Sequence, residues 1–426
     1  MNRLLDELSA LEGTEARAPC GLLRLTGARV AIDARTAVPA EVVIEGGYIR
    51  ELLTDAAPSP RAARNPDSGL TVDLSGYLLL PGLINAHDHL EFNLFPRLGN
   101  GPYANFREWA DDIFRPETSP VREHLAIPKP VRLWWGAIKN LLCGVTTVCH
   151  HNPYQQEIFG KDFPVRVVSH FGWAHSLALE KDVAGLFRAT PDDAPFLIHL
   201  GEGTDAESAR EIFELDRLGA LDSRTVIIHG VGLDRGGRAL VEERGAGLVW
   251  CPSSNLFTLG KTLGRDDLRQ HRRVALGSDS ALTAQGDLLD EIRVAQSATC
   301  VGSKQLFNMV TREAAEILRL PRCQGSLQAG TVADVIALPD WGQSPADTLA
   351  ESSFREVELV VLAGQPQLLA VNMLSRWPKE TCEEFGTLQV EDSVRWVRAP
   401  LPWLVEETSG HLPAPVRLAG RSVRPA

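Results

Sequence analysis

The chain has 426 residues, of which 44% are hydrophobic, and its formal net charge is −12. A chain of this length and composition predicts a large buried core, in one large domain with a smaller companion. The negative charge argues against nucleic acid or an anionic membrane surface as the main partner, and it identifies no substrate. No segment reaches the roughly 18 consecutive apolar residues that a membrane span needs.

The cysteines and the first residues indicate in which cellular compartment the protein is expected. The seven cysteines are scattered and none forms a CxxC pair, which favours reduced thiols in a cytosol. Charges at Asp6, Glu7 and Glu12 interrupt the apolar run that a signal peptide would need. We therefore expect a soluble, cytoplasmic protein.

Residues 21–80 read as short strands with turns, because apolar positions alternate and glycines punctuate them. The same pattern of alternating apolar residues and glycines occurs again at 325–340 and 356–371. These two regions predict a small β-sandwich domain built from both chain ends, 1–80 and 323–426. The tail from about Pro400 is rich in proline and is expected to loop over the surface.

The middle of the chain, residues 81–322, alternates short apolar strands with helical stretches. The readable strands are "GVTTVCHH", "VRVVSHF", "FLIHLGE", "TVIIHG", "GLVWCPSSN" and "VALGSDS". This alternation predicts an α/β fold with a parallel sheet, and its length favours a (β/α)8 TIM-like barrel. Only residues 165–179 lie where the barrel needs its third and fourth strands, so either that stretch bends into two short strands or one strand is missing.

Side chains capable of chemistry follow most of these strands where each strand ends. His87 and His89 end the stretch "LLLPGLINAHDH", and residues two apart on a strand point to the same face while Asp88 points to the other. Because the C-terminal ends of barrel strands form one rim, other strand-end residues are expected to meet this pair. These residues are His199, Glu202, His229 and Asp279. Neutral imidazoles with one carboxylate suit zinc or a similar divalent ion, with a position left open for water.

The same residues resemble the amidohydrolase superfamily and, within it, the branch of cytosine, guanine and thiomethyladenosine/S-adenosylhomocysteine deaminases. The matching segments are "PGLINAHDH", "HLGEG", the "HG" at His229, "CPSSNL", "GSDS" and the later "GSLQAGTVADVIALPD". The resemblance spans residues 21–369 and is specific for the superfamily, but much less so for the substrate.

The resemblance implies a set of ligands for one divalent metal ion, zinc in the first place with iron or manganese as alternatives. These ligands are His87, His89, His199 and Asp279. Binuclear relatives use a carboxylated lysine on the fourth strand, whereas no lysine here ends a plausible strand and Lys181 lies in the helical-looking "LEKDVAGLF". A mononuclear site is therefore preferred.

A divalent ion lowers the pKa of bound water from 15.7 to about 7. In this interpretation Asp279 takes the proton of that water, and Glu202 shuttles a proton to a ring nitrogen or a leaving amine. His229 stabilises the developing oxyanion, orients the nucleophile or serves as an additional ligand. The alternatives are a carboxylate at a helix N-terminus for Glu202 and a core histidine for His229.

Four residues are candidates for substrate contacts. His175, followed by Ser176, resembles a substrate-contacting His-Ser pair of the deaminase branch, and Trp173 lies beside it. The pair His150-His151 has three open interpretations: substrate binding, for which His151 is the candidate, weak binding of a second metal, or hydrogen bonding across the rim. Arg97 lies in a long loop after the first barrel strand that either forms a lid or packs as surface.

These observations leave three hypotheses. The first is a metal-dependent hydrolase of carbon–nitrogen bonds that deaminates a nitrogen heterocycle or amidine. The second is the same chemistry used to open a cyclic amide or imidazolone ring or to release a halide. The third is a non-catalytic barrel that retains metal. A small-molecule substrate is the partner implied by the first two, and the resemblance allows a homodimer without requiring one.

Overall fold

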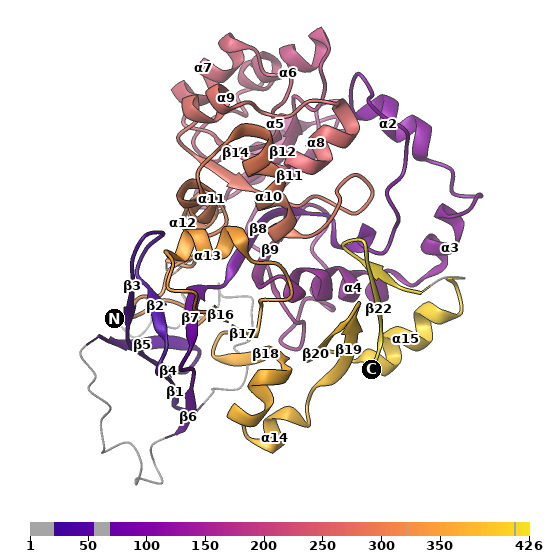
Figure 1. The fold of residues 1–426 in the computed structure, drawn as a ribbon. Helices are drawn as coiled ribbons and strands as arrows, with labels where there is room; N and C mark the ends of the chain where they lie inside the picture. Colours follow the sequence, from indigo (N-terminus) through magenta and orange to yellow (C-terminus); the bar gives the residue numbers. More distant parts are fainter. Residues whose placement is uncertain (1–20, 55–68, 322, 413–414) are drawn as a thin grey trace, which may run out of the picture.

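The computed structural model describes residues 21–54, 69–321, 323–412 and 415–426 (Figure 1). The first twenty residues, on which the absence of a signal peptide was judged, lie outside this part. Within the described residues, no helix combines the length and the apolar character that crossing a bilayer requires. The six described cysteines are all free thiols, as expected.

The centre of the molecule is formed by parallel strands in two sheets, one three-stranded in the order β10-β9-β8 and one five-stranded in the order β11-β12-β13-β14-β15. Their bounds are β8 (Leu83–Asp88), β9 (Val145–His150), β10 (Arg166–Val167), β11 (Gly172–Ser176), β12 (Phe196–Leu200), β13 (Thr225–His229), β14 (Gly247–Trp250) and β15 (Val274–Leu276). Strands β8, β9 and β12–β15 are buried at every position, which explains why they read as continuous apolar runs.

The α/β class is confirmed, and the region that looked one strand short bends into two, β10 and β11. Among the described residues, no sheet pairing joins β10 to β11 or β15 to β8. The ends of β8 and β15 nevertheless lie side by side, because the Asp279 amide donates to the His87 carbonyl at 3.0 Å. Gly277 permits this approach, since a Cβ there would lie 2.7 Å from that of His87.

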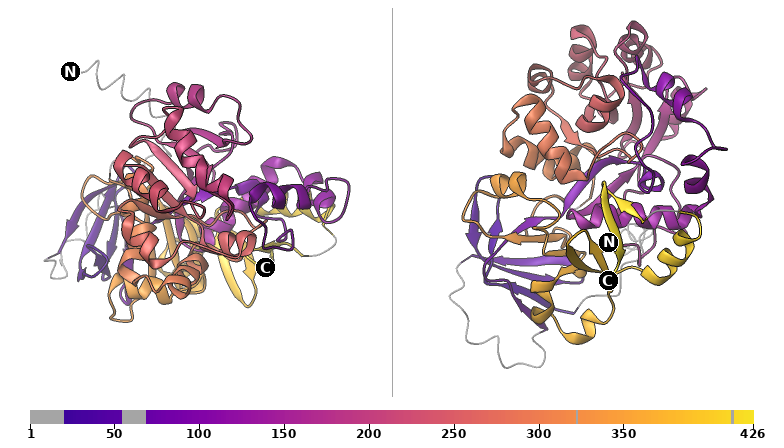
Figure 2. Two further views of the ribbon diagram at one scale, coloured as in Figure 1. Left: turned by 90° about the horizontal axis from the view of Figure 1, so that it is seen from above. Right: turned by 45° about the vertical axis from the view of Figure 1, so that its right-hand side comes forward.

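Helices connect the strands and cover them (Figures 1 and 2). Their bounds are α2 (Phe106–Ile113), α3 (Val121–Ala126), α4 (Lys129–Leu142), α5 (Val183–Ala189), α6 (Ala206–Arg217), α7 (Arg235–Arg244), α8 (Pro252–Leu259), α9 (Arg265–Gln270), α10 (Leu288–Thr299), α11 (Ser303–Met309), α12 (Arg312–Ile317), α13 (Pro345–Glu351), α14 (Lys379–Cys382) and α15 (Leu401–Ser409). Aspartates cap several of them: Asp205 begins α6, and Asp287 begins α10 with a capping box.

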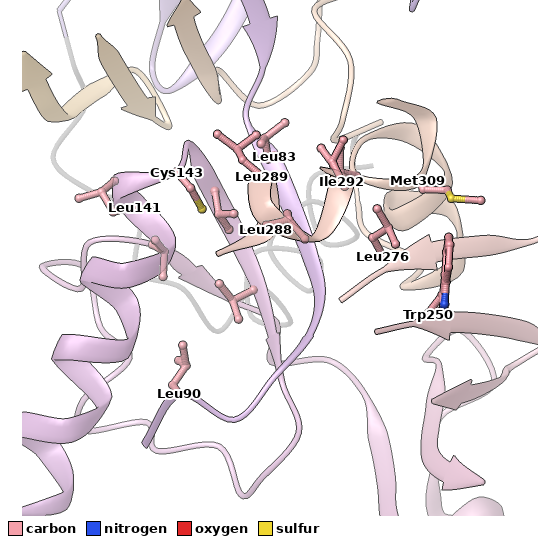
Figure 3. Packing of buried hydrophobic residues seen from close by; sticks show 14 of the residues in the cluster. Leu83, Leu90, Leu141, Cys143, Trp250, Leu276, Leu288, Leu289, Ile292 and Met309 are labelled. Carbon is pink, nitrogen blue, oxygen red and sulfur yellow. The ribbon is translucent and has the colours of Figure 1, made fainter. Parts of the chain in front are cut away.

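The main hydrophobic core lies between these helices and the parallel strands. Figure 3 shows part of it, where Leu83 of β8, Leu276 of β15 and Leu141 of α4 belong to one cluster with Leu288 and Ile292 of α10. Burying a side chain of this size contributes about 1.5–3 kcal/mol. This packing makes the strands a rigid base for the residues at their ends.

Both ends of the chain contribute to a β-rich part with two sheets. The first has the order β5 (Tyr48–Leu53), β4 (Glu41–Glu45), β1 (Leu23–Thr26) and β6 (Leu70–Asp73). The ten-stranded second sheet has the order β21 (Arg417–Leu418), β22 (Arg421–Pro425), β19 (Gly386–Val390), β20 (Ser393–Val397), β18 (Gln365–Ala370), β17 (Leu359–Leu362), β16 (Val335–Pro339), β7 (Tyr77–Pro81), β2 (Arg29–Ala31) and β3 (Ala37–Pro39). Side chains of both sheets share one hydrophobic cluster, in which Leu25 and Val42 pack with Leu79 and Val361. The antiparallel pairing of β7 with β16 joins the N-terminal to the C-terminal segment.

The expectation that the tail loops over the surface from Pro400 is wrong. Residues 401–409 form α15, and the last residues form the hairpin β21–β22 at the edge of the large sheet (Figures 1 and 2). The indole of Trp135 on α4 donates a hydrogen bond to Thr408 at 2.9 Å, so α15 is fixed against the core. Proline at the first turn of α15 is compatible with a helix, because the amide it lacks has no partner there.

Candidate metal-binding active site

Three histidines from β8 and β12 converge at the C-terminal ends of the parallel strands. The Nε2 atom of His199 lies 3.3 Å from Nε2 of His87 and 3.4 Å from Nε2 of His89. Two zinc–nitrogen bonds of the usual length at a tetrahedral angle would separate their nitrogens by about 3.3–3.4 Å. The spacing of these donors therefore fits an ion of that size.

The protonation of these rings also fits a cation. Burial, assisted by neighbouring imidazoles, holds the pKa values of His87 and His199 well below their usual range, so both are neutral at pH 7. Nδ1 of His199 donates to the carbonyl of His175 at 2.8 Å, which leaves a lone pair on Nε2. A ligating histidine commonly makes such a hydrogen bond through its other nitrogen.

Asp279, three residues beyond β15, lies beside His87 and His89. Its Oδ1 lies 3.7 Å from Nε2 of His87 and 4.0 Å from Nε2 of His89, while Oδ2 accepts a hydrogen bond from Ser254 at 2.7 Å. Burial by itself would raise the pKa of Asp279, but His229, His89 and the Ser254 hydroxyl together lower it. The Asp279 carboxylate is therefore ionised at neutral pH.

A carboxyl–imidazole pair lies next to this group. Oε2 of Glu202 is 3.6 Å from Nε2 of His229, whose Nδ1 donates to the side chain of Asn255 at 2.7 Å. Burial, only partly opposed by His229, raises the pKa of Glu202 to about 7. Asn255 lies in the segment "CPSSNL", where the sequence did not separate structural from substrate-contacting roles, and in the structure it fixes the His229 ring.

The backbone at two of these residues is in the left-handed region. His229 has φ 73° and Asp279 has φ 52°. Such a conformation costs a residue other than glycine about 1–3 kcal/mol and persists only where the surroundings enforce it. In both cases it occurs where the chain turns away from a strand end.

A fully buried polar network lies beneath the group and was missed by sequence reasoning. Asp88 faces away from the histidines, as the strand alternation predicted, and its Oδ2 lies 3.2 Å from Nζ of Lys139 on α4. Lys139 also donates to Asn93 at 2.9 Å and to Ser278 at 3.1 Å. The lysine thereby links β8, the loop after it and the end of β15. The available signal was a carboxylate on a buried strand, on the face opposite the histidines, because a buried charge requires a partner.

The loop after β8 crosses the mouth of the site. The Phe106 amide donates to the Glu202 carbonyl at 3.0 Å, and Asn105 forms a β-bridge with Gly203. Arg97 in the same loop is exposed, lies over the ring of Phe257 and lines a cavity of about 550 Å³ away from the histidine group. Its contact with a substrate stays a prediction.

The remaining substrate candidates lie closer to the histidines. His175 and Trp173 on β11 are half-buried; the centroid of the His175 ring is 4.7 Å from that of His199, and Trp173 meets His151 edge-on at 5.5 Å. Burial lowers the pKa of His175 to about 4. His150 and His151 have different surroundings. Nε2 of His150 lies 3.4 Å from Oε2 of Glu91, while His151 belongs to the histidine group.

Among the described residues, two sets have the spacing to hold a metal ion. The first is His87, His89, His151 and His199, and the second is His87, His229 and Asp279. Lys181, expected inside a helix, lies in the bend before α5, because the helix begins only at Val183, after its N-cap Asp182.

Comparison with known proteins shows which family and which proteins this chain resembles. The profile of the amidohydrolase family matches residues 175–366, which include His199, His229 and Asp279. Over these residues the chain is similar to the amidohydrolase family. A relative from Pyrococcus furiosus, named 5-methylthioadenosine/S-adenosylhomocysteine deaminase, is 24% identical over 370 residues that cover 71% of this chain and 83% of the relative. A relative of the same name from Saccharophagus degradans is 26% identical over 357 residues, 70% of this chain and 78% of that protein.

Solved structures share the fold of this chain. An adenosine deaminase from Xanthomonas campestris with bound zinc has a TM-score of 0.69 at 18% identity, covering 92% of this chain and 97% of the other. An atrazine chlorohydrolase from Arthrobacter aurescens complexed with zinc has a TM-score of 0.65 at 18% identity, covering 92% and 100%. At these identities the likeness concerns the fold alone.

Proposed function

We propose that this protein is a metal-dependent enzyme that hydrolyses a carbon–nitrogen bond and deaminates a nitrogen heterocycle or a related amidine. The observation that carries the proposal is the meeting of His87, His89 and His199, at zinc-like spacing, with Asp279. The scaffold we propose is a TIM-like barrel with a small β domain, divided at residues 81 and 322. The names of the deaminase relatives support the reaction class.

His87, His89, His199 and Asp279 would hold one divalent ion. Neutral nitrogen donors with one carboxylate fit zinc best, and iron or manganese are alternatives. When bound, such an ion makes water acidic enough to act as a nucleophile near neutral pH. The chain's own residues must then accept and deliver the protons.

Asp279 is the proposed proton acceptor, because its carboxylate is ionised and lies next to the imidazoles. Glu202 is the proposed proton donor, because with a pKa of about 7 it still carries a proton in a large fraction of molecules at neutral pH. Water adds to the ring carbon and gives one proton to Asp279, while Glu202 protonates the ring nitrogen. The proton on Asp279 then passes to the amine, which departs as ammonia, and the remaining hydroxyl proton returns to Glu202.

His229 depends on Asn255 for its role. Because Nδ1 donates to Asn255, the neutral ring offers a lone pair at Nε2, where Glu202 is the nearest proton source. His229 therefore orients the attacking water when neutral and stabilises a developing oxyanion when protonated. His175 and Trp173 are the proposed contacts for a small-molecule substrate, together with His151 or Arg97.

The test is metal analysis of the purified protein, followed by assays of ammonia release. The panel contains purines, pyrimidines, triazines and pterins, with 5-methylthioadenosine and S-adenosylhomocysteine included because the relatives carry those names. Ammonia at enzymatic rates supports deamination. Ring opening or halide release without ammonia would replace it with the second hypothesis. Full metal occupancy with no turnover on any compound would favour a non-catalytic barrel.

A further inference from the structure

His151 is a fully buried histidine whose two ring nitrogens have different surroundings. Nε2 lies 3.1 Å from the carbonyl oxygen of Ala174, which accepts hydrogen bonds only, so the proton of a neutral ring belongs on Nε2. Nδ1 then carries a lone pair. Within the described part of the chain, this buried atom has no hydrogen-bond partner.

The ring that carries this unpartnered nitrogen belongs to the histidine group. The His151 ring stacks on His199 with centroids 4.3 Å apart and planes 19° apart, and its centroid is 5.2 Å from that of His87 and 5.9 Å from that of His89. One nitrogen from each of these four rings lies within 4.8 Å of the corresponding atom in every other. Four imidazoles meet where three were expected.

The neighbouring histidine has a different environment. Nδ1 of His150 accepts a hydrogen bond from the Leu90 amide at 3.2 Å, and its Nε2 faces the Glu91 carboxylate at 3.4 Å. His150 therefore has a hydrogen-bond partner at Nδ1 and a carboxylate beside Nε2, both outside the group. A buried acceptor left unsatisfied costs about 1–3 kcal/mol, so Nδ1 of His151 requires another explanation.

We propose that Nδ1 of His151 is a further ligand of the ion held by His87, His89 and His199, so that four imidazoles bind it. This inference rests on the proposed metal site and assigns His151 to the ion in place of the substrate. Its bond to the Ala174 carbonyl parallels that of His199 to the His175 carbonyl, and such bonds orient ligating imidazoles. A nitrogen-rich set of this kind favours zinc, iron, nickel or copper over magnesium, calcium or manganese.

The first test counts the nitrogen neighbours of the ion by X-ray absorption on the wild-type protein loaded with zinc. Four imidazole nitrogens are expected, and three would overturn the proposal. The second test compares His151→Phe, which preserves the ring stacking, with the matched control His150→Phe in the adjacent position. Zinc affinity is measured by competition with a chelator.

Loss of a side chain that only orients a ligand weakens metal binding by about 10–100-fold, so loss of a direct ligand should exceed about 100-fold. The nitrogen count should fall by one in His151→Phe and stay unchanged in His150→Phe. Affinity lowered at an unchanged count would make His151 a positioning residue for His199 and would reject the ligand. Zinc binding with the same affinity and the same nitrogen count as the wild type would also reject it.

If the wild type binds no metal, the proposed function itself fails, which distinguishes that failure from the failure of this inference. Should His151→Phe not fold, His151→Gln replaces it. A nitrogen count in His151→Gln equal to that of the wild type would then reject His151 as a ligand.

Discussion

Replacing Lys139 by methionine tests whether the buried network beneath the histidines holds the ends of β8 and β15 together. Lys139 is 2% exposed, and its Nζ contacts Asp88, Asn93 and Ser278. Methionine keeps much of the side-chain volume but leaves the Asp88 carboxylate buried without its cation. Breaking a buried pair in this way costs about 3–5 kcal/mol.

The corresponding change in melting temperature follows from the chain length. An unfolding entropy of about 2.1 cal/mol/K per residue gives about 0.9 kcal/mol/K for a chain of this size, so Lys139→Met should lower the melting temperature by about 3–6 °C. Circular dichroism and tryptophan fluorescence should report the same midpoint, which checks that the protein unfolds in one step. Lys379→Met is the matched control, because Lys379 forms only an exposed ion pair with Glu383 worth about 0–1 kcal/mol.

The double variant Asp88→Asn/Lys139→Met separates the ion pair from its surroundings. Removing both charges leaves no uncompensated ion, so the loss should be clearly smaller than the sum of the two single losses. Additive losses, or a Lys139→Met effect no larger than that of Lys379→Met, would refute the view that this lysine neutralises Asp88 and ties the two strands together.

Four further outcomes are expected. Asp279→Asn should abolish turnover without changing the circular dichroism spectrum, and retained activity would remove Asp279 from the mechanism. Glu202→Gln should lower kcat by about 10²–10⁴-fold with unchanged metal content, whereas a change confined to KM would reassign it to substrate binding. Chelation should abolish activity and lower the melting temperature, since an ion present at a thousand times its Kd contributes about 4 kcal/mol; recovery on adding zinc is the control. Burial raises the pKa of Glu291 to about 8. Between about pH 5 and pH 8 the folded protein therefore keeps this proton, whereas the unfolded chain loses it. The free energy of unfolding falls as the pH rises through this range. Glu291→Gln should therefore raise the melting temperature at pH 8 relative to the wild type and change it little at pH 5; equal shifts at both pH values would contradict this.

Much of the site was predictable because its signals are local. Alternation along a strand places His87 and His89 on one face and Asp88 on the other, whatever the rest of the chain does. Continuous apolar strands alternating with helices indicate a parallel sheet, whose strand ends share one edge. The convergence of His199 and Asp279 with this pair follows from that architecture.

Other features depended on contacts between distant segments. The sequence alone left three interpretations open for the pair His150-His151, with His151 as the candidate for substrate binding. Only the structure shows how the two differ, because the chain leaves β9 between them and each ring meets different neighbours. The same holds for Lys139, which finds Asp88 across 51 residues through the packing of α4 on β8.

By itself, then, the sequence determined the fold class, the order of the elements and most residues of the histidine group, since periodicity and strand ends are set by neighbours along the chain. Only the tertiary structure decided which imidazoles face one another, which charge neutralises Asp88 and where the two chain ends pair. Those outcomes depend on the relative placement of elements, and that placement is set by packing over the whole core.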